Sequence, residues 1–137
     1  MGSPSPASPT PEAPRLEQPR YVLAVPDLAR TAAYYRDVLG FEVREMGDPG
    51  WRWFQRDGCV IMAGHCPNAL PPQDLGDHNY FAYVAVSSVD ALHAEFRTRG
   101  ATLIKPLRSE PWGMREFGVR TVDGHRIMFG ERLAAEP

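Results

Sequence analysis

The chain has 137 residues, 43% of them hydrophobic, which is enough to bury the core of one compact domain. Its formal net charge of −2 and the absence of an apolar run of roughly 20 residues give no reason to expect nucleic acid or a membrane as partner. The two cysteines, Cys59 and Cys66, form no CxxC pair and the N-terminus has no signal-peptide pattern, so we expect a reduced, cytoplasmic protein.

The N-terminal segment 1–19 contains six prolines and almost no large apolar side chain. Such a segment cannot bury enough surface to offset the entropy lost on ordering, so the composition predicts a flexible tail. A docking arm that crosses to a partner subunit is the alternative interpretation.

The next segment has the pattern of one helix among short strands. Asp27 is suited to cap a helix, and Gly40 to end it. Between them apolar residues recur at the spacing of one helix face: Leu28, Ala32, Tyr35 and Leu39. The strands expected around this helix are 20–25, 41–45, 51–55 and 59–63, the last two joined by a tight turn.

A second segment of the same kind follows a Pro-, Gly- and Asn-rich linker, 65–78. We expect a helix capped by Ser88 and ended by Gly100, and a loop over 105–114, which contains two prolines and a glycine. The expected strands are 80–86, 102–104, 115–122 and 125–131.

These two segments are an internal repeat. Residues 57–64 (DGCVIMAG) return 66 positions later as residues 123–130 (DGHRIMFG), with the Asp-Gly, Ile-Met and final glycine in register. Each copy is an Asp-Gly turn followed by the second strand of a hairpin. The repeat predicts a single α+β domain, 20–132, made of two βαβββ modules, with the remaining residues 133–137 as a short tail.

Module one of the predicted fold comprises residues 20–64, and module two comprises residues 79–132. Each module should form a curved four-stranded mixed sheet with its helix on the outer face. The two inner faces would then enclose a cup-shaped cavity, which is the usual anatomy of a small-molecule site.

Two stretches resemble a known family. Residues 25–28 (VPDL), followed by 35–41 (YRDVLGF), resemble the opening of the vicinal-oxygen-chelate superfamily, which includes glyoxalase I, extradiol dioxygenases and bleomycin-resistance proteins. Residues 112–117 (WGMREF) with 123–127 (DGHRI) are similar to the bleomycin-resistance-like branch. The resemblance covers residues 20–131 and implies the same α+β fold.

The metal enzymes of this family hold their ion at four positions, which the resemblance places at Arg20, Met62, Phe81 and Met128. None of these side chains is a carboxylate or an imidazole. Arginine has no lone pair to offer, and thioethers suit soft ions rather than the divalent ions of these enzymes. We therefore expect no metal and no other cofactor.

Strand alternation predicts which side chains line the cup. The cup should be apolar and rich in sulfur, with tryptophans nearby that favour stacking on a flat or conjugated ligand. The predicted ligand-binding residues are Arg20, Val22, Trp51, Trp53, Met62, Phe81, Tyr83, Trp112, Arg126 and Met128.

Some of these residues have a second interpretation. Trp51 and Trp53 are equally typical of a core or a dimer interface. Arg20 and Arg126 are suited to bind a ligand carboxylate or phenolate, or else to pair with Glu116 or Glu131. Bleomycin-type ligands are cationic, so two arginines argue against bleomycin itself.

The sequence and the resemblance together favour a metal-free homodimer that sequesters a small hydrophobic or aromatic compound, as antibiotic-resistance proteins of this branch do. The alternative is an enzyme of the same superfamily, a lyase, isomerase or dioxygenase-like protein, with Glu116 as its general acid or base. A nucleophile with an adjacent base cannot be recognised in the sequence.

Overall fold

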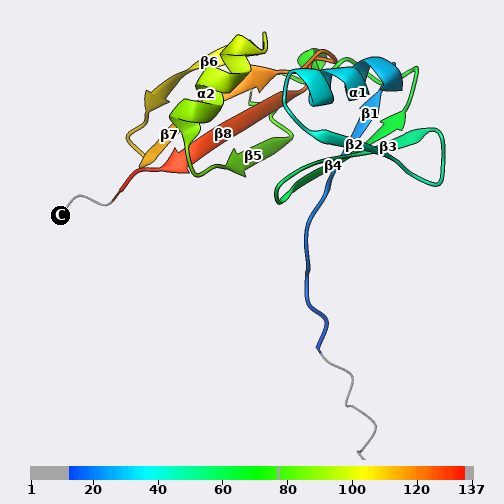
Figure 1. The fold of residues 1–137 in the computed structure, drawn as a ribbon, viewed down its shortest axis with the longest axis horizontal. Coiled ribbons are helices and arrows are strands. Elements are labelled where there is room, and N and C mark those ends of the chain that lie inside the picture. Colours follow the sequence, from blue (N-terminus) through cyan, green and yellow to red (C-terminus); the bar gives the residue numbers. More distant parts are fainter. Residues whose placement is uncertain (1–12, 77, 135–137) are drawn as a thin grey trace, which may run out of the picture.

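The computed structural model describes residues 13–76 and 78–134, which form two βαβββ modules side by side (Figure 1). The elements of module one are β1 (Tyr21–Val25), α1 (Leu28–Asp37), β2 (Glu42–Glu45), β3 (Trp51–Arg56) and β4 (Cys59–His65). Those of module two are β5 (Ala82–Ala85), α2 (Val89–Thr98), β6 (Thr102–Ser109), β7 (Met114–Arg120) and β8 (Arg126–Arg132). A short 3₁₀ helix, Pro72–Leu75, lies in the linker.

Each module forms one unclosed four-stranded mixed sheet, in the order β1-β4-β3-β2 and β5-β8-β7-β6. The first strand of each module runs parallel to the last, and the remaining pairs are antiparallel. The predicted α+β fold with two equivalent modules is therefore confirmed. The predicted tails lie partly outside the described residues; residues 13–20, which are described, contain no helix or strand and are exposed.

Turn and cap chemistry sets the ends of the helices. The Asp27 carboxylate accepts a hydrogen bond from the Arg30 backbone N–H at 3.0 Å, as expected of an N-cap. Gly40 and Gly100 follow the two helices with φ of +75° and +86°, a conformation that favours glycine. The cap predicted for α2 differs, because Ser88 makes no side-chain cap bond; the Glu131 carboxylate accepts from the Val89 N–H at 3.1 Å instead.

The loop predicted over 105–114 is wrong, because β6 continues to Ser109 through Pro106. Pro106 has no N–H to give to a sheet. It is accommodated because β6 is an edge strand and its pairing with β7 shifts register on both sides of Lys105. The loop that remains, 110–113, is short and carries Trp112.

One hydrophobic core extends through both modules and consists mainly of aromatic side chains. In module one Tyr35 stacks on Phe54 with ring centroids 4.7 Å apart. In module two Phe117 stacks on Phe129 at 5.5 Å, with Phe96 edge-on to both. Within the described residues, no helix is long and apolar enough to cross a membrane.

Two groups of hydrogen bonds, which we call locks, join the hairpin end of each module to the helix of the other. In the module-one lock, Arg56 donates two hydrogen bonds to Glu95 of α2, at 2.6 and 3.0 Å. In the module-two lock, the buried carboxylate of Asp123 accepts from Arg30 at 3.0 Å and from the Thr31 hydroxyl at 2.5 Å. These locks fix the orientation of the two sheets relative to each other.

Candidate functional site

Each sheet packs one face against its helix and leaves the other face open. Along β1, Leu23 and Val25 are buried, whereas Val22 and Ala24, which alternate with them, are exposed, Val22 to 61%. Along β5, Ala82 is buried and Tyr83 is 43% exposed. The alternation of burial thus follows the two faces predicted from the sequence. We call the solvent-facing sides open face one, on β1–β4, and open face two, on β5–β8.

Open face one is built around two tryptophans on the central strand β3. Trp53 lies opposite Met62, which in turn lies beside Val22, so the three side chains form one row across the sheet. Trp51 lies opposite Gly64, and its ring covers that glycine: a methyl group there would lie 2.8 Å from the indole carbon Cη2. The result is an aromatic and sulfur-containing surface on regular strands.

The Trp53 ring is held in place on two sides. Its Nε1–H donates to the Gln55 side-chain oxygen at 3.0 Å. The guanidinium carbon of Arg20 lies 4.6 Å from the ring centroid, within the range of a cation–π contact. Arg20 and Trp53, predicted separately from the sequence, are therefore in contact.

Open face two has a different composition. Tyr83 lies beside Met128, and Ala85 lies beside Gly130. The Tyr83 hydroxyl lies directly over Gly130, where any side chain would collide with it. Burial, and to a lesser degree the nearby charge of Glu116, raises the pKa of the Tyr83 hydroxyl.

The last glycine of the sequence repeat, Gly64 in module one and Gly130 in module two, therefore has the same structural role in both copies. Gly64 leaves room for the Trp51 ring, and Gly130 leaves room for Tyr83. In each sheet the missing side chain leaves room for an aromatic side chain over the open face. The repeat was recognised in the sequence, but the reason for its last residue became clear only in the structure.

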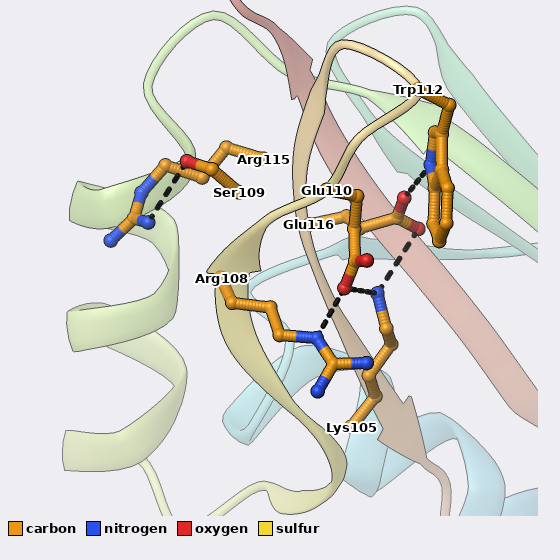
Figure 2. A network of polar contacts seen from close by, with 7 residues as sticks. All are labelled: Lys105, Arg108, Ser109, Glu110, Trp112, Arg115 and Glu116. Atoms are coloured by element: carbon orange, nitrogen blue, oxygen red, sulfur yellow. Dashed lines mark hydrogen bonds and ion pairs between the residues drawn. The ribbon is translucent and has the colours of Figure 1, made fainter.

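Trp112 extends from the β6–β7 loop and is held by charged residues (Figure 2). Its side chain is 64% exposed, while its Nε1–H donates to Glu116 Oε1 at 2.5 Å. Lys105 Nζ lies 3.6 Å from the other oxygen of Glu116 and 5.6 Å from the Trp112 ring centroid. Glu116, only 3% exposed, is thus occupied on both oxygens.

A second buried carboxylate, Glu110, completes this network. Lys105 Nζ donates to Glu110 at 3.0 Å, and Arg108 donates to the same oxygen. These two hydrogen bonds hold the pKa of the Glu110 carboxyl below its usual range. The negative charges of Glu110 and Glu116 balance the positive charges of Lys105 and Arg108, so the network carries no net charge. Sequence reasoning found Trp112 and Glu116 but missed Lys105 and Glu110, because it assigned residues 105–114 to a loop.

The predicted pairing of arginines with Glu116 or Glu131 is not what the described residues show. Glu116 is bound by Trp112 and Lys105, and Glu131 caps α2. Arg126, on β8, donates instead to the backbone oxygen of Gly76 in the linker at 3.2 Å.

Phe81 lies apart from the other predicted ligand-binding residues. Its ring packs edge-on against Tyr21 at 5.8 Å and against His125 at 5.7 Å, at the margin of the core. Strand alternation does not determine its direction, because β5 begins only at Ala82. Its role in ligand binding stays a prediction.

A cavity of about 740 Å³ lies between the modules. Its walls are the edge strand β5 and the residues that follow it, one face of α2, the β3–β4 turn and the residues preceding β1. Of the predicted ligand-binding residues, Tyr83 lines this cavity. The tryptophans and methionines predicted to bind ligand lie on the open faces outside it.

The side chains do not fit the metal centre that the family resemblance implies. At the four implied positions stand Arg20, Met62, Phe81 and Met128, which offer no oxygen or nitrogen lone pair. Within residues 13–76 and 78–134, no group of three or more His, Cys, Asp or Glu side chains is placed to hold a metal ion. The metal-free state itself stays a prediction.

Solved structures with this arrangement include two that share 25% sequence identity with the chain. TioX from Micromonospora sp. ML1 aligns over 85% of this chain and 99% of its own, with a TM-score of 0.68. The bleomycin-binding protein of bleomycin-producing Streptomyces verticillus, solved with copper(II)-bleomycin, aligns over 90% and 100%, also at 0.68. A bleomycin resistance determinant of transposon Tn5, 18% identical over 85% of this chain and 98% of its own, shares the fold with a TM-score of 0.71.

No curated protein matches the chain significantly. A family profile, in contrast, matches residues 17–129, which is nearly the whole of the two modules. The chain therefore belongs to the glyoxalase/bleomycin resistance protein/dioxygenase superfamily.

Proposed function

We propose that this protein binds and sequesters a small, flat, hydrophobic or aromatic compound without converting it. The observation that carries the proposal is open face one, where Trp53 lies in one row with Met62 and the largely exposed Val22, and Trp51 follows in the next row, over Gly64. Exposed apolar surface of this kind commonly marks a binding site. Tryptophan offers a large flat surface and methionine adapts to irregular ligand shapes, which suits an aromatic ligand.

The relatives support the same class of function. The Streptomyces verticillus protein, 25% identical, was solved in complex with copper(II)-bleomycin and is described as bleomycin-binding. A resistance-like role, in which the protein removes a toxic compound from solution by binding it, requires affinity but no chemistry. The open faces offer stacking surfaces, and the part of the chain that the structure describes holds no group of three or more potential metal ligands, in keeping with such a role.

We further propose that two copies associate and cover each other's open faces. Val22, Tyr83 and Trp112 are 61%, 43% and 64% exposed in the single chain. Burying such side chains is favourable by about 25 cal/mol per Å² of apolar surface. A symmetric dimer would enclose two equivalent sites. Sedimentation or light scattering that found only monomers at micromolar concentration would contradict this part of the proposal.

An enzymatic function would rest on Glu116, the buried carboxylate of open face two. A general acid or base needs an oxygen that can reach the substrate. Both oxygens of Glu116 are already engaged, by Trp112 and by Lys105, so its position favours a structural role. Binding without catalysis is therefore the function we propose.

Tryptophan fluorescence tests the proposal directly. A panel of planar aromatic compounds, including aromatic antibiotics, should shift or quench the emission in a saturable way with one site per chain. Trp53→Leu and Trp112→Ala should each weaken binding about tenfold, as expected for the loss of one stacking surface. Tyr34→Phe, which alters only a hydroxyl on α1 that bonds the Arg120 carbonyl, is the matched control.

Two results would contradict the proposed function. One is the absence of any saturable response across the panel. The other is one equivalent of a tightly bound divalent metal per chain in elemental analysis, with an activity that a chelator removes.

A further inference from the structure

The charged side chains of open face one are not balanced. Arg44 donates two hydrogen bonds to Glu42, at 3.0 and 3.3 Å, and is therefore neutralised by its neighbour. Arg20 is exposed and, among the residues that the structure describes, makes no hydrogen bond or ion pair with an acid. The positive charge of Arg20 is thus available to an incoming ligand.

The position of Arg20 fits a planar partner. Its guanidinium carbon lies 4.6 Å from the Trp53 ring centroid, so ring and guanidinium are in van der Waals contact. A guanidinium that stacks on a ring keeps the N–H groups at its edge for acceptors, and it binds carboxylates and similar anions in a bidentate way. The Trp53 N–H already donates a hydrogen bond to Gln55, so a ligand can contact only the ring surface of the indole.

The same arrangement works against a cationic ligand. A cation placed over an aromatic ring uses the negative potential of that ring, so a second cation is attracted less and is repelled by the first. Both Trp53 and Trp112 already hold a cation, Arg20 at 4.6 Å and Lys105 at 5.6 Å. The carboxylates of open face two do not reverse this preference, because Lys105 and Arg108 neutralise them.

We propose that the ligand is an anionic planar aromatic compound, with its ring on the Trp53–Met62 surface and its carboxylate, sulfonate or phenolate bound by Arg20. This inference rests on the proposed binding function and narrows its ligand class. Arg20 would then distinguish among aromatic compounds of equal size by their charge.

Three naphthalene derivatives with the same ring test the inference by isothermal titration calorimetry at low ionic strength. They are naphthalene-2-sulfonate, 2-naphthylmethanol and 2-naphthylmethylammonium, with charges of −1, 0 and +1. The sulfonate should bind about tenfold more tightly than the ammonium, since charge-assisted hydrogen bonds are stronger than neutral ones. The preference should shrink at 0.5 M salt because salt screens exposed charges.

Two arginine variants identify the residue responsible. Arg20→Gln should remove the preference for the sulfonate, while its circular dichroism spectrum stays that of the unchanged protein. Arg44→Gln, which removes an arginine already paired on the same face, should leave the preference intact. The inference is overturned if the ammonium binds as tightly as the sulfonate, or if Arg20→Gln retains the preference.

The outcomes also separate this inference from the proposed function. If no naphthalene derivative binds but other planar compounds still quench tryptophan emission, the anionic class is wrong and the binding function stands. If neither the derivatives nor the panel bind, both are wrong.

Discussion

The two open faces present aromatic rings in different ways, although the modules share one topology. On face one, Trp51 stands on the central strand β3 opposite Gly64. At the equivalent place on face two, opposite Gly130, β7 has Glu116 instead. Face two therefore takes its rings from elsewhere, from Tyr83 on the edge strand and from Trp112 on a loop. A duplicated backbone can place aromatic groups on the same side of the sheet by separate routes.

The two ways of presenting a ring also differ in the interactions that hold the ring in place. A tryptophan on a strand is positioned by the sheet itself, through its backbone hydrogen bonds. A tryptophan on a loop needs side chains to hold it, and Glu116 and Lys105 do so here. Burying these charges is tolerated because each has a partner. Face two thus carries a polar network that face one does not require.

The two locks between the modules differ as well. In the module-two lock the Asp123 side chain is fully buried, whereas in the module-one lock Arg56 and Glu95 are each about a third exposed, at 30% and 32%. Ion pairs near water contribute little to stability, and buried hydrogen-bonded charges are costly to disrupt. The module-two lock should therefore contribute more.

Removing each lock tests this comparison and has the largest expected effect. Asp123→Ala should lower the free energy of unfolding by about 2–3 kcal/mol, because it removes hydrogen bonds to a buried charged group. Arg56→Ala should cost about 1 kcal/mol or less. Urea denaturation of both variants measures the difference, with Arg36→Ala, an exposed arginine on α1, as control. Equal losses for Asp123→Ala and Arg56→Ala would contradict the comparison.

Adding a methyl group to each repeated glycine separates the two open faces. Gly64→Ala should destabilise the protein by about 1–2 kcal/mol, because three atoms of the Trp51 ring lie within 3.0 Å of the new carbon. Gly130→Ala should change stability by only about 0.5 kcal/mol, since the exposed Tyr83 side chain can turn away. Thermal denaturation measures both variants. A larger loss for Gly130→Ala would show that Tyr83 is fixed more firmly than Trp51.

The smallest expected effect is a dependence on pH that belongs to module two alone. The repeat places Cys59 and His125 at equivalent positions, and burial raises the pKa of the Cys59 thiol and lowers the pKa of His125 below its ordinary value of 6.5. Because the pKa of His125 is lower in the folded protein than in the unfolded chain, the unfolded chain binds more protons below about pH 6.5. Its contribution to stability is present above that pH and is lost as the pH falls.

Urea denaturation at pH 7.5 and pH 5.5 measures this contribution. The unchanged protein should be less stable at pH 5.5, and His125→Asn should reduce that difference. Cys59→Ser, the matching change in module one, should leave it as it is. An undiminished difference in His125→Asn would assign the pH dependence to other groups.

Much of the fold could be predicted because its signals are local. The Asp27 cap, the glycines after both helices and the Asp-Gly turns each depend on a few neighbouring residues. Strand alternation assigned the open and buried faces, since side chains on a strand point to opposite sides in turn. Because the sequence repeats, the helix and strands predicted in one module supported the corresponding prediction in the other.

The parts that could not be predicted depend on contacts between distant residues. The path of β6 through Pro106 follows from its place at the edge of the sheet, which the local sequence does not reveal. The binding of Lys105 to Glu110 and Glu116 depends on that path. Phe81 precedes its strand, so its direction was set by packing against Tyr21 and His125.

By itself the sequence determined the two modules, their βαβββ order, and the kinds of side chain that alternate along their strands. Only the tertiary structure decided that Arg20 lies on Trp53, that Lys105 and Glu116 hold Trp112, and that each module is locked to the helix of the other. Periodicity and turn chemistry act over a few residues, and a single chain displays them directly. A charge or a ring finds its partner only when strands and loops far apart in the chain have packed together.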